Sequence, residues 1–276
     1  MSEPIIRITD LTKDFYTYTT GHQKVMHRLF GMEKVTPSVG LTGVSLTVER
    51  GEKIALIGNR GSGRSTLMRI LAGLVPPTSG IFEVNGEITP YFSHQLGFDM
   101  ALPGRDNLRL RARLRGWSKK EVAAKEQEII DFADLADIID MPMKTYRGGT
   151  AARLGFTIDT TYKPDILLYD CFFGFGTAEY TRRCLERFYN LMDEEVTLLM
   201  TLSNIAIASK ICTRGLVLHE GALVFDGALK EALKYYKANC RPKTAAGEQL
   251  LGRVVDDNME GEEEETDSDD SMGDVF

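Results

Sequence analysis

The chain has 276 residues, 43% of them apolar, which suffices for a substantial core and for one large or two small domains. Its net charge of −7 comes from the stretch between Asp256 and Phe276, which holds 11 acidic side chains and no basic one, so the remainder is mildly basic. A secretory leader, a membrane-spanning segment and a cysteine-bound metal are not expected, because no signal-like start, no apolar run near about 18 residues and no Cys-x-x-Cys spacing occurs.

The first predicted strands are Ile5 to Leu11 and Val44 to Val48. The residues between them, Tyr16 to Ser38, contain several aromatic side chains and a glycine break, and are predicted to form an insertion at a strand edge. The apolar run Lys53 to Ile57 is predicted to be a buried parallel strand.

The segment Gly58 to Thr66 fits the phosphate-binding loop G-x-x-x-x-G-K-[ST] at every fixed position but one. It consists of Gly58, Asn59, Arg60, Gly61, Ser62, Gly63, Arg64, Ser65 and Thr66. The apolar residues that follow at helical spacing are Leu67, Ile70, Leu71 and Leu74. The loop is therefore predicted to join a strand to a helix, with backbone N–H groups of residues 61–65 forming an anion-binding nest. Ser65 would place its hydroxyl on a magnesium ion.

Arg64 stands where the loop pattern has lysine. A guanidinium is wider and planar, so the exchange is not conservative at a tight phosphate site. An error of about 1 Å in position can cost roughly a hundredfold in rate. The alternative, a glycine-rich turn without a ligand, is disfavoured because strand, loop and helix agree. The segment predicts nucleotide binding more firmly than nucleotide hydrolysis.

An Asn-Gly pair at residues 85–86 lies between two short apolar runs, Ile81 to Val84 and Glu87 to Thr89, and predicts a hairpin. The stretch Asn107 to Asp140 is predicted to be helical. Basic residues crowd Arg105 to Lys120, which favours either a contact with a partner or a solvated helix face. Aromatic residues do not alternate with this charge, so no nucleic-acid partner is predicted.

The second half of the chain alternates predicted strands with helices. The predicted elements are a helix after Gly149, strands at Asp165 to Asp170 and Val196 to Thr201, a hairpin at Gly215 to Gly227 that turns at Glu220-Gly221, and a closing helix at Ala228 to Tyr236. Strands in alternation with helices predict an α/β fold with a mostly parallel core sheet.

Three further segments are similar to motifs of one protein family. Met141 to Tyr146 (MPMKTY) precedes a glycine pair, as the segment M-P-x-K-x-Y does in polysaccharide exporters. Leu102 to Asn107 (LPGRDN) is similar to the segment L-T-G-R-E-N of those exporters. Lys163 to Asp165 leads into a predicted strand that ends in an acidic residue, as does the segment before a Walker B aspartate. On these segments, about residues 4 to 240 resemble the nucleotide-binding subunit of an ABC transporter, and most closely those that export capsular polysaccharide and lipopolysaccharide O-antigen.

The resemblance implies a P-loop NTPase fold of the ABC ATPase type, with an antiparallel β subdomain and an inserted helical subdomain at about 99–160. Residues 1–245 would form the nucleotide-binding domain, and residues 246–276 a disordered acidic tail. ATP and Mg²⁺ are the implied ligands. The implied partners are an integral membrane permease and a second nucleotide-binding subunit, identical or different, that closes head to tail. The implied location is the cytoplasmic face of the inner membrane, as a peripheral protein.

The resemblance also assigns site residues. Asp170 is expected to hold magnesium through water, together with Ser65. Phe15 or Tyr16 would stack on adenine, and Gln95 is a candidate for the loop glutamine. The signature motif, which faces the ATP of the partner subunit, would be Arg147, Gly148 and Gly149.

Five positions depart from the family pattern: Arg64, Cys171, Asn204, Thr177 and Arg147. Cys171 and Asn204 replace the catalytic glutamate and the switch histidine, Thr177 the aspartate of the D-loop, and Arg147 the signature serine. A thiol is a poor substitute for a carboxylate base. Arg147 is instead a candidate cation toward the partner's γ-phosphate. No catalytic group is intact, so ATP hydrolysis is expected to be very slow or absent.

Three functions remain open from the sequence. The first is a transport subunit that binds ATP and gates a polysaccharide-exporting permease with weak or no turnover. The second is a non-hydrolytic regulatory or assembly protein on the same fold. The third, another P-loop enzyme such as a small-molecule kinase, is disfavoured by the glycine pair at 148–149 and the late hairpin.

Overall fold

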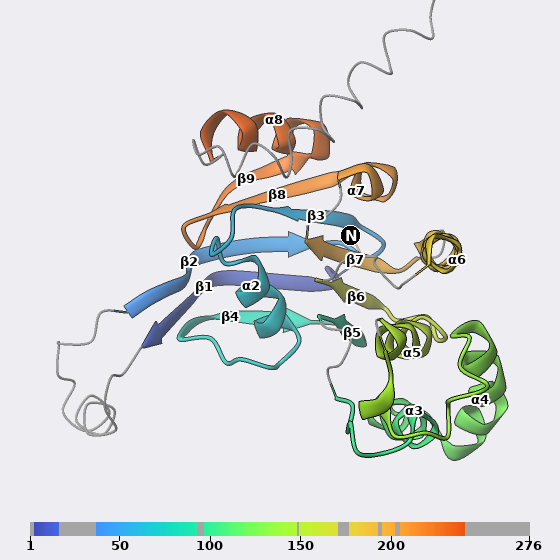
Figure 1. The fold of residues 1–276 in the computed structure, drawn as a ribbon. Helices are drawn as coiled ribbons and strands as arrows, with labels where there is room; N and C mark the ends of the chain where they lie inside the picture. The colour runs from blue at the N-terminus through green and yellow to red at the C-terminus, as the bar shows by residue number, and fades with distance from the viewer. Residues whose placement is uncertain are drawn as a thin grey trace, which may run out of the picture.

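The structure is a computed structural model that describes residues 3–16, 37–92, 97–147, 149–170, 177–192, 195–201 and 205–240 (Figure 1). Two sheets form its centre. The antiparallel sheet has the order β2 (Pro37–Val48), β1 (Ile6–Tyr16), β4 (Ser79–Val84). The larger sheet has the order β5 (Ile88–Tyr91), β6 (Ile166–Tyr169), β7 (Thr197–Thr201), β3 (Lys53–Ile57), β8 (Arg214–His219), β9 (Ala222–Ala228). All its neighbours pair in parallel except β8 and β9, which form the predicted hairpin. The α/β prediction is confirmed.

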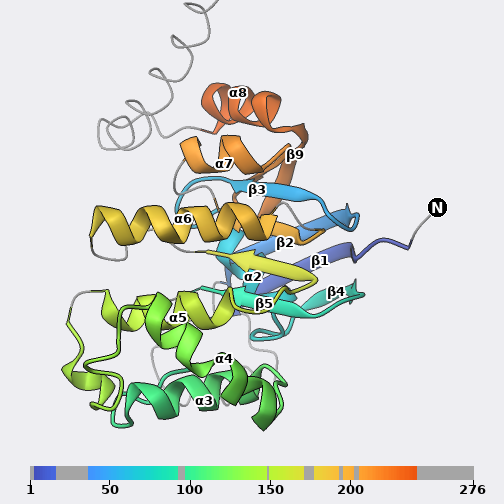
Figure 2. The ribbon, with the colours of Figure 1, turned by 90° about the vertical axis from the view of Figure 1, so that its right-hand side faces the viewer.

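The described helices lie between the strands, and three of them, with a 3₁₀ turn, follow β5 in succession. They are α2 (Arg64–Leu71), α3 (Gly104–Leu114), α4 (Lys119–Phe132), the 3₁₀ turn η1 (Met143–Thr145), α5 (Thr150–Asp159), α6 (Ala178–Met192), α7 (Ile205–Ile211) and α8 (Leu229–Asn239). Figure 2 shows α3, α4 and α5 gathered at the β5 end of the parallel sheet. Among these helices, none combines the length and apolarity that crossing a bilayer requires.

The parallel sheet is buried on both faces, which explains why its strands are almost wholly apolar. In β3, Ala55 and Ile57 belong to a cluster with residues of α6 and α8, whereas Ile54 and Leu56 pack with α2 and the antiparallel sheet. Successive side chains of a strand point to opposite faces, so one five-residue strand serves two cores. A third cluster, which includes Leu154, joins α3, α4 and α5.

The predicted hairpin at residues 85–86 is wrong. β4 pairs with β1 in the antiparallel sheet, whereas β5 pairs with β6 in the parallel one. The Asn85 side chain donates to the Pro4 carbonyl at 3.0 Å, and the Glu87 N–H donates to Asp165 Oδ2 at 2.9 Å. The turn therefore carries the chain from one sheet to the other.

Two helix predictions also need correction. The predicted helical stretch Asn107 to Asp140 is two helices, and the first of them already begins at Gly104. The helix after the phosphate-binding loop ends at Leu71, because Gly73 adopts a left-handed conformation with φ 71°. Leu74 therefore lies beyond the helix and is exposed rather than packed in the core.

Candidate nucleotide-binding site

The loop Gly58 to Thr66 joins β3 to α2, in the strand-to-helix context that its pattern requires. Gly63 has φ 104°, and a Cβ there would lie 2.5 Å from the Gly40 carbonyl oxygen. A Cβ on Gly58 would lie 2.4 Å from the carbonyl oxygen of Leu218. Only glycine fits at these two positions, so the loop backbone lies directly against β2 and β8.

Backbone hydrogen bonds hold the loop in place from the hairpin side. The Gly221 N–H donates to the Ser62 carbonyl at 3.1 Å, and the Gly221 carbonyl accepts from the Thr42 N–H at 2.8 Å. The β8–β9 turn thus links the loop to β2. The sequence predicted this turn but carried no signal that it would contact the loop.

The side chain of Asn59 is held by the C-terminal end of α8. The Tyr236 hydroxyl donates to Asn59 Oδ1 at 2.6 Å, and Asn59 Nδ2 donates to the Cys240 carbonyl at 2.5 Å. We call this arrangement of Asn59, Tyr236 and Cys240 the α8 clamp. Sequence reasoning missed it, because the partners lie more than 170 positions apart (177 for Tyr236) and no local pattern relates them.

A pocket of about 320 Å³ opens over the loop. It is lined by Phe15, Gly40 and the loop residues Asn59 to Thr66. Phe15 lies near the end of β1 with its ring exposed, and the Lys13 ammonium is 5.4 Å from the ring centroid. The structure therefore brings the predicted adenine-stacking Phe15 to the predicted phosphate loop. Tyr16 does not line this pocket.

Two buried polar atoms at the loop have no hydrogen-bond partner: Ser62 Oγ and Arg64 Nε. Ser62 is only 4% exposed. In addition, no side chain caps the N-terminus of α2, which begins at Arg64 after the left-handed Gly63. Unsatisfied donors and a helix N-terminus are the groups that bind phosphate. These groups of the loop are therefore suited to binding phosphate.

Arg64 lies largely inside the protein. Burial lowers the pKa of its guanidinium, and the negative charge of Asp170 is the main influence that raises this pKa again. Asp170 follows β6; its Oδ1 accepts from Thr201 Oγ1 at 2.8 Å, and its N–H donates to the Tyr91 carbonyl at 2.9 Å. The predicted magnesium carboxylate is thus held in place at the end of β6 by Thr201 and by the backbone of β5.

The signature residues lie apart from this pocket within one chain. Gly149 adopts a left-handed conformation, φ 68°, at the start of α5, and Arg147 precedes it with an exposed side chain. The Thr150 hydroxyl donates to the Arg147 carbonyl. Neither Arg147 nor Gly149 lines the loop pocket.

The remaining predicted positions have mixed outcomes. Thr177 precedes α6, where its hydroxyl accepts from the Tyr180 N–H at 3.3 Å, so this residue caps the helix. Cys171, Asn204, Gly148 and Gln95 lie outside the described residues.

Two of the three motif segments that carried the family resemblance, Leu102 to Asn107 and Met141 to Tyr146, pack against each other. The Met143 N–H donates to the Leu102 carbonyl at 3.0 Å, and the Tyr146 hydroxyl donates to the Ile138 carbonyl at 3.1 Å. A Cβ on Gly104 would lie 2.0 Å from this hydroxyl oxygen. Buried Asn107 accepts from the Asp99 N–H and donates to the Asp99 carbonyl. These motif residues build one structural junction ahead of α3 and α5.

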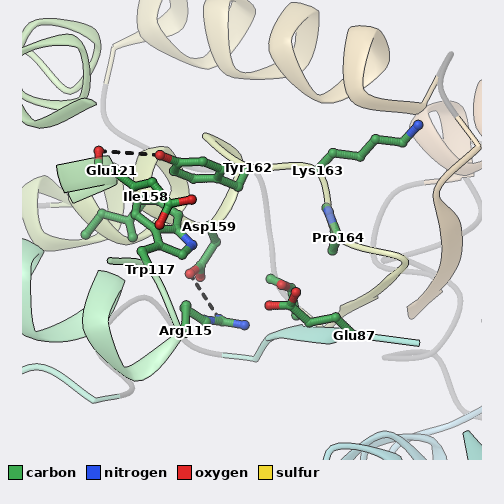
Figure 3. A pocket seen from close by; sticks show the side chains of 11 residues that line it. Glu87, Arg115, Trp117, Glu121, Ile158, Asp159, Tyr162, Lys163 and Pro164 are labelled. Carbon is green, nitrogen blue, oxygen red and sulfur yellow. Dashed lines mark hydrogen bonds and ion pairs between the residues drawn. The ribbon is translucent and has the colours of Figure 1, made fainter. Parts of the chain in front are cut away.

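A second cavity, of about 250 Å³, lies between the start of β5 and the helices α3 to α5 (Figure 3). Several of its polar groups bind one another. Asp159 accepts from Arg115 at 3.0 Å, and the Tyr162 hydroxyl donates to the Glu121 carbonyl at 3.4 Å (Figure 3). The Glu121 carboxylate caps its own helix through the Ser118 N–H. This cavity therefore lacks the unsatisfied groups that mark the loop pocket.

Comparisons with known proteins agree with this geometry. A family model described as ABC transporter matches residues 41–171. The O-antigen export ATP-binding protein RfbB of Klebsiella pneumoniae is 31% identical over 85% of this chain and 98% of its own length. Teichoic acids export ATP-binding protein TagH of Lactiplantibacillus plantarum is 32% identical, and the match covers 84% of this chain and 64% of that protein. TagH of Enterococcus faecalis is 37% identical, and the match covers 84% of this chain and 52% of that protein.

Solved structures share the fold. An ATP-binding subunit of an ABC transporter superposes with a TM-score of 0.65 at 19% identity, over 91% of this chain and 99% of that one. A dimeric ATP-binding cassette in a post-hydrolysis state, bound to ADP and Pi, superposes with a TM-score of 0.63 at 18% identity. This match covers 81% of this chain and 98% of that one. Because a relative that it covers almost completely is 31% identical, the chain belongs to the ABC transporter family.

Proposed function

We propose that this chain is the ATP-binding subunit of an ABC transporter that exports a cell-surface polysaccharide, and that it binds ATP with weak or no hydrolysis. The observation that carries the binding is the loop pocket, where the unpartnered Ser62 Oγ, the uncapped start of α2 and the ring of Phe15 meet. The export relatives act on teichoic acids and O-antigen, which supports a polysaccharide as the exported class.

Slow or absent ATP hydrolysis is proposed because the residues of both nucleotide sites of a dimer depart from the family pattern. When two copies pair head to tail, each site combines the loop of one copy with the signature motif of the other. Cys171 and Asn204 would stand beside the phosphates in place of a carboxylate and an imidazole. Because phosphoryl transfer depends on positioning and charge neutralisation, losses of this kind cost about two to four orders of magnitude each and are not additive.

The proposed permease contact uses exposed apolar side chains of α3 and the loops beside it rather than the arginines of the basic stretch. Arg105 binds Asp140 and Glu126, and Arg111 and Arg115 bind Asp159, so these arginines are engaged within the chain. The apolar side chains that α3 and the two motif loops leave exposed are Leu102, Leu110, Leu114 and Met141. Exposed apolar groups of this kind favour a protein partner, here a membrane permease that recruits the chain to the cytoplasmic face of the inner membrane.

Equilibrium binding with a fluorescent ATP analogue, combined with phosphate release from the same sample, tests the proposal. The expected result is saturable binding that ATP displaces better than AMP, because the nest addresses the β- and γ-phosphates, together with phosphate release near the background. Absence of binding contradicts the nucleotide-binding function, and rapid phosphate release contradicts the weak hydrolysis. Co-purification with a membrane permease separates the transport subunit from a regulatory or assembly protein.

A further inference from the structure

Gly40 of β2 lines the loop pocket and contacts both the aromatic ring and the phosphate-binding loop. A Cβ on Gly40 would lie 2.6 Å from Phe15 Cε2 and 3.0 Å from the Lys13 carbonyl oxygen. The carbonyl oxygen of Gly40 would in turn lie 2.5 Å from a Cβ on Gly63. One buried residue therefore separates the ring that would stack on the base from the loop that would bind the phosphates.

The backbone conformation of Gly40 does not require glycine, because its φ lies outside the left-handed region. Gly40 is the extra residue of a β-bulge: β1 advances by one residue, from Lys13 to Asp14, where β2 passes from Leu41 to Val39. Bulges bend a strand and redirect the side chains beside them. An alanine could adopt this backbone, so the space that the aromatic ring occupies is what excludes a side chain at position 40.

A second group holds the Phe15 ring in place. The Lys13 ammonium lies 5.4 Å from the ring centroid and donates to the Pro76 carbonyl at 2.7 Å. A cation over an aromatic ring attracts it, and this cation is itself anchored to the backbone. The Phe15 side chain still has 40% of its surface exposed, which leaves area for a stacked base.

We infer that Gly40 is a positioning residue for the nucleotide, because it lets the Phe15 ring pack against β2 at a set distance from the phosphate-binding loop. This inference rests on the proposed nucleotide binding and adds the residue that sets the spacing between base and phosphates. A methyl group at position 40 displaces the ring, so stacking on the base is lost while the phosphates keep their loop.

Gly40→Ala is the test substitution, and Gly227→Ala is its matched control. Gly227 also lies in a strand without a left-handed φ, and a Cβ there would lie 3.1 Å from an atom of the Phe225 ring. Gly227 does not line the loop pocket. Both substitutions place a methyl group against an aromatic ring, but only the first ring belongs to the nucleotide site.

The experiment measures how ATP and inorganic tripolyphosphate displace a ribose-labelled fluorescent ATP analogue from the full chain. For Gly40→Ala, the dissociation constant of ATP is expected to rise at least about fivefold, because base–aromatic stacking is lost. That of tripolyphosphate, which has no base to stack, is expected to change by less than about twofold. Gly227→Ala is expected to leave both constants unchanged.

A double substitution supplies the second readout. Phe15→Ala is expected to reproduce the selective loss of ATP affinity. Adding Gly40→Ala to Phe15→Ala is expected to cost less than about twofold more, because two substitutions that remove the same contact are not additive. Thermal unfolding of each variant verifies that it is folded; if Gly40→Ala alone does not fold, the double variant, which lacks the obstructing ring, is expected to fold.

Four results contradict the inference. Equal weakening of ATP and tripolyphosphate by Gly40→Ala would show that Gly40 acts on the loop and not through the ring. Unchanged ATP binding in this variant would show that the ring does not need the space. An undiminished loss in the Phe15→Ala background, or a double variant that does not fold, would show that Gly40 does not act through Phe15. If the unaltered chain binds neither ATP nor tripolyphosphate, the proposed function itself fails, and the inference with it.

Discussion

At the scale of single residues, the carboxylate of Asp159 is the most deeply buried charge among the ion pairs of the described residues, with its side chain 1% exposed. It accepts hydrogen bonds from Arg111 and Arg115 at 2.5 and 3.0 Å. Asp159→Asn keeps the shape but leaves two guanidinium groups without their counter-charge. We expect the free energy of unfolding to fall by about 3–5 kcal/mol, measured by urea denaturation.

The matched control for this substitution is Asp140→Asn. Asp140 also binds an arginine, Arg105, at 2.7 Å, but its side chain is 71% exposed and Arg105 keeps Glu126 as a second partner. We expect a loss within about 1 kcal/mol. Equal losses for the two variants would show that burial does not govern these pairs.

At the scale of secondary-structure elements, the contact between Gly104 and Tyr146 joins the start of α3 to the segment before α5. Gly104→Ala would force a methyl group against a hydroxyl oxygen that is 2.0 Å from the new Cβ position. We expect a loss of about 1–3 kcal/mol in the free energy of unfolding. In a Tyr146→Phe background the obstructing atom is absent, so the same substitution should cost less; additive losses would argue against the contact.

The α8 clamp makes a second prediction at this scale, because it connects the closing helix to the phosphate-binding loop. Tyr236→Phe removes the hydroxyl that binds Asn59 at 2.6 Å. A hydrogen bond of this kind contributes about 0.5–1.5 kcal/mol, so we expect nucleotide affinity to fall by roughly two- to tenfold in an equilibrium titration. Tyr235→Phe, on the same helix, is the control and should leave affinity unchanged.

The elements also show what the sequence could predict. The loop, its flanking strand and helix, and the hairpin at Glu220 were predictable because local spacing and turn chemistry determine them. The turn at Asn85 was mistaken for a hairpin, because a local signal does not reveal that its two strands join different sheets. Asn59 and Tyr236, or Arg115 and Asp159, meet only through tertiary packing, so no local pattern could relate them.

At the scale of the whole molecule, the proposed permease contact lies on the exposed face of α3. Leu114 is 72% exposed there, and Leu114→Glu is expected to reduce co-purification with the permease strongly, because it places a charge in an apolar contact. Ile81→Glu is the control, since Ile81 is 67% exposed on β4 of the other sheet. Equal loss of co-purified permease in both variants would contradict a permease contact on α3.

We propose above all that the chain binds ATP and hydrolyses it very slowly or not at all. The most direct measurement is to incubate the purified chain with radiolabelled ATP, isolate the protein rapidly and separate the bound nucleotide by chromatography. We expect the nucleotide to bind in saturable amounts and to be recovered as intact ATP after many minutes. Recovery of ADP with steady phosphate release, or of no nucleotide at all, would contradict it.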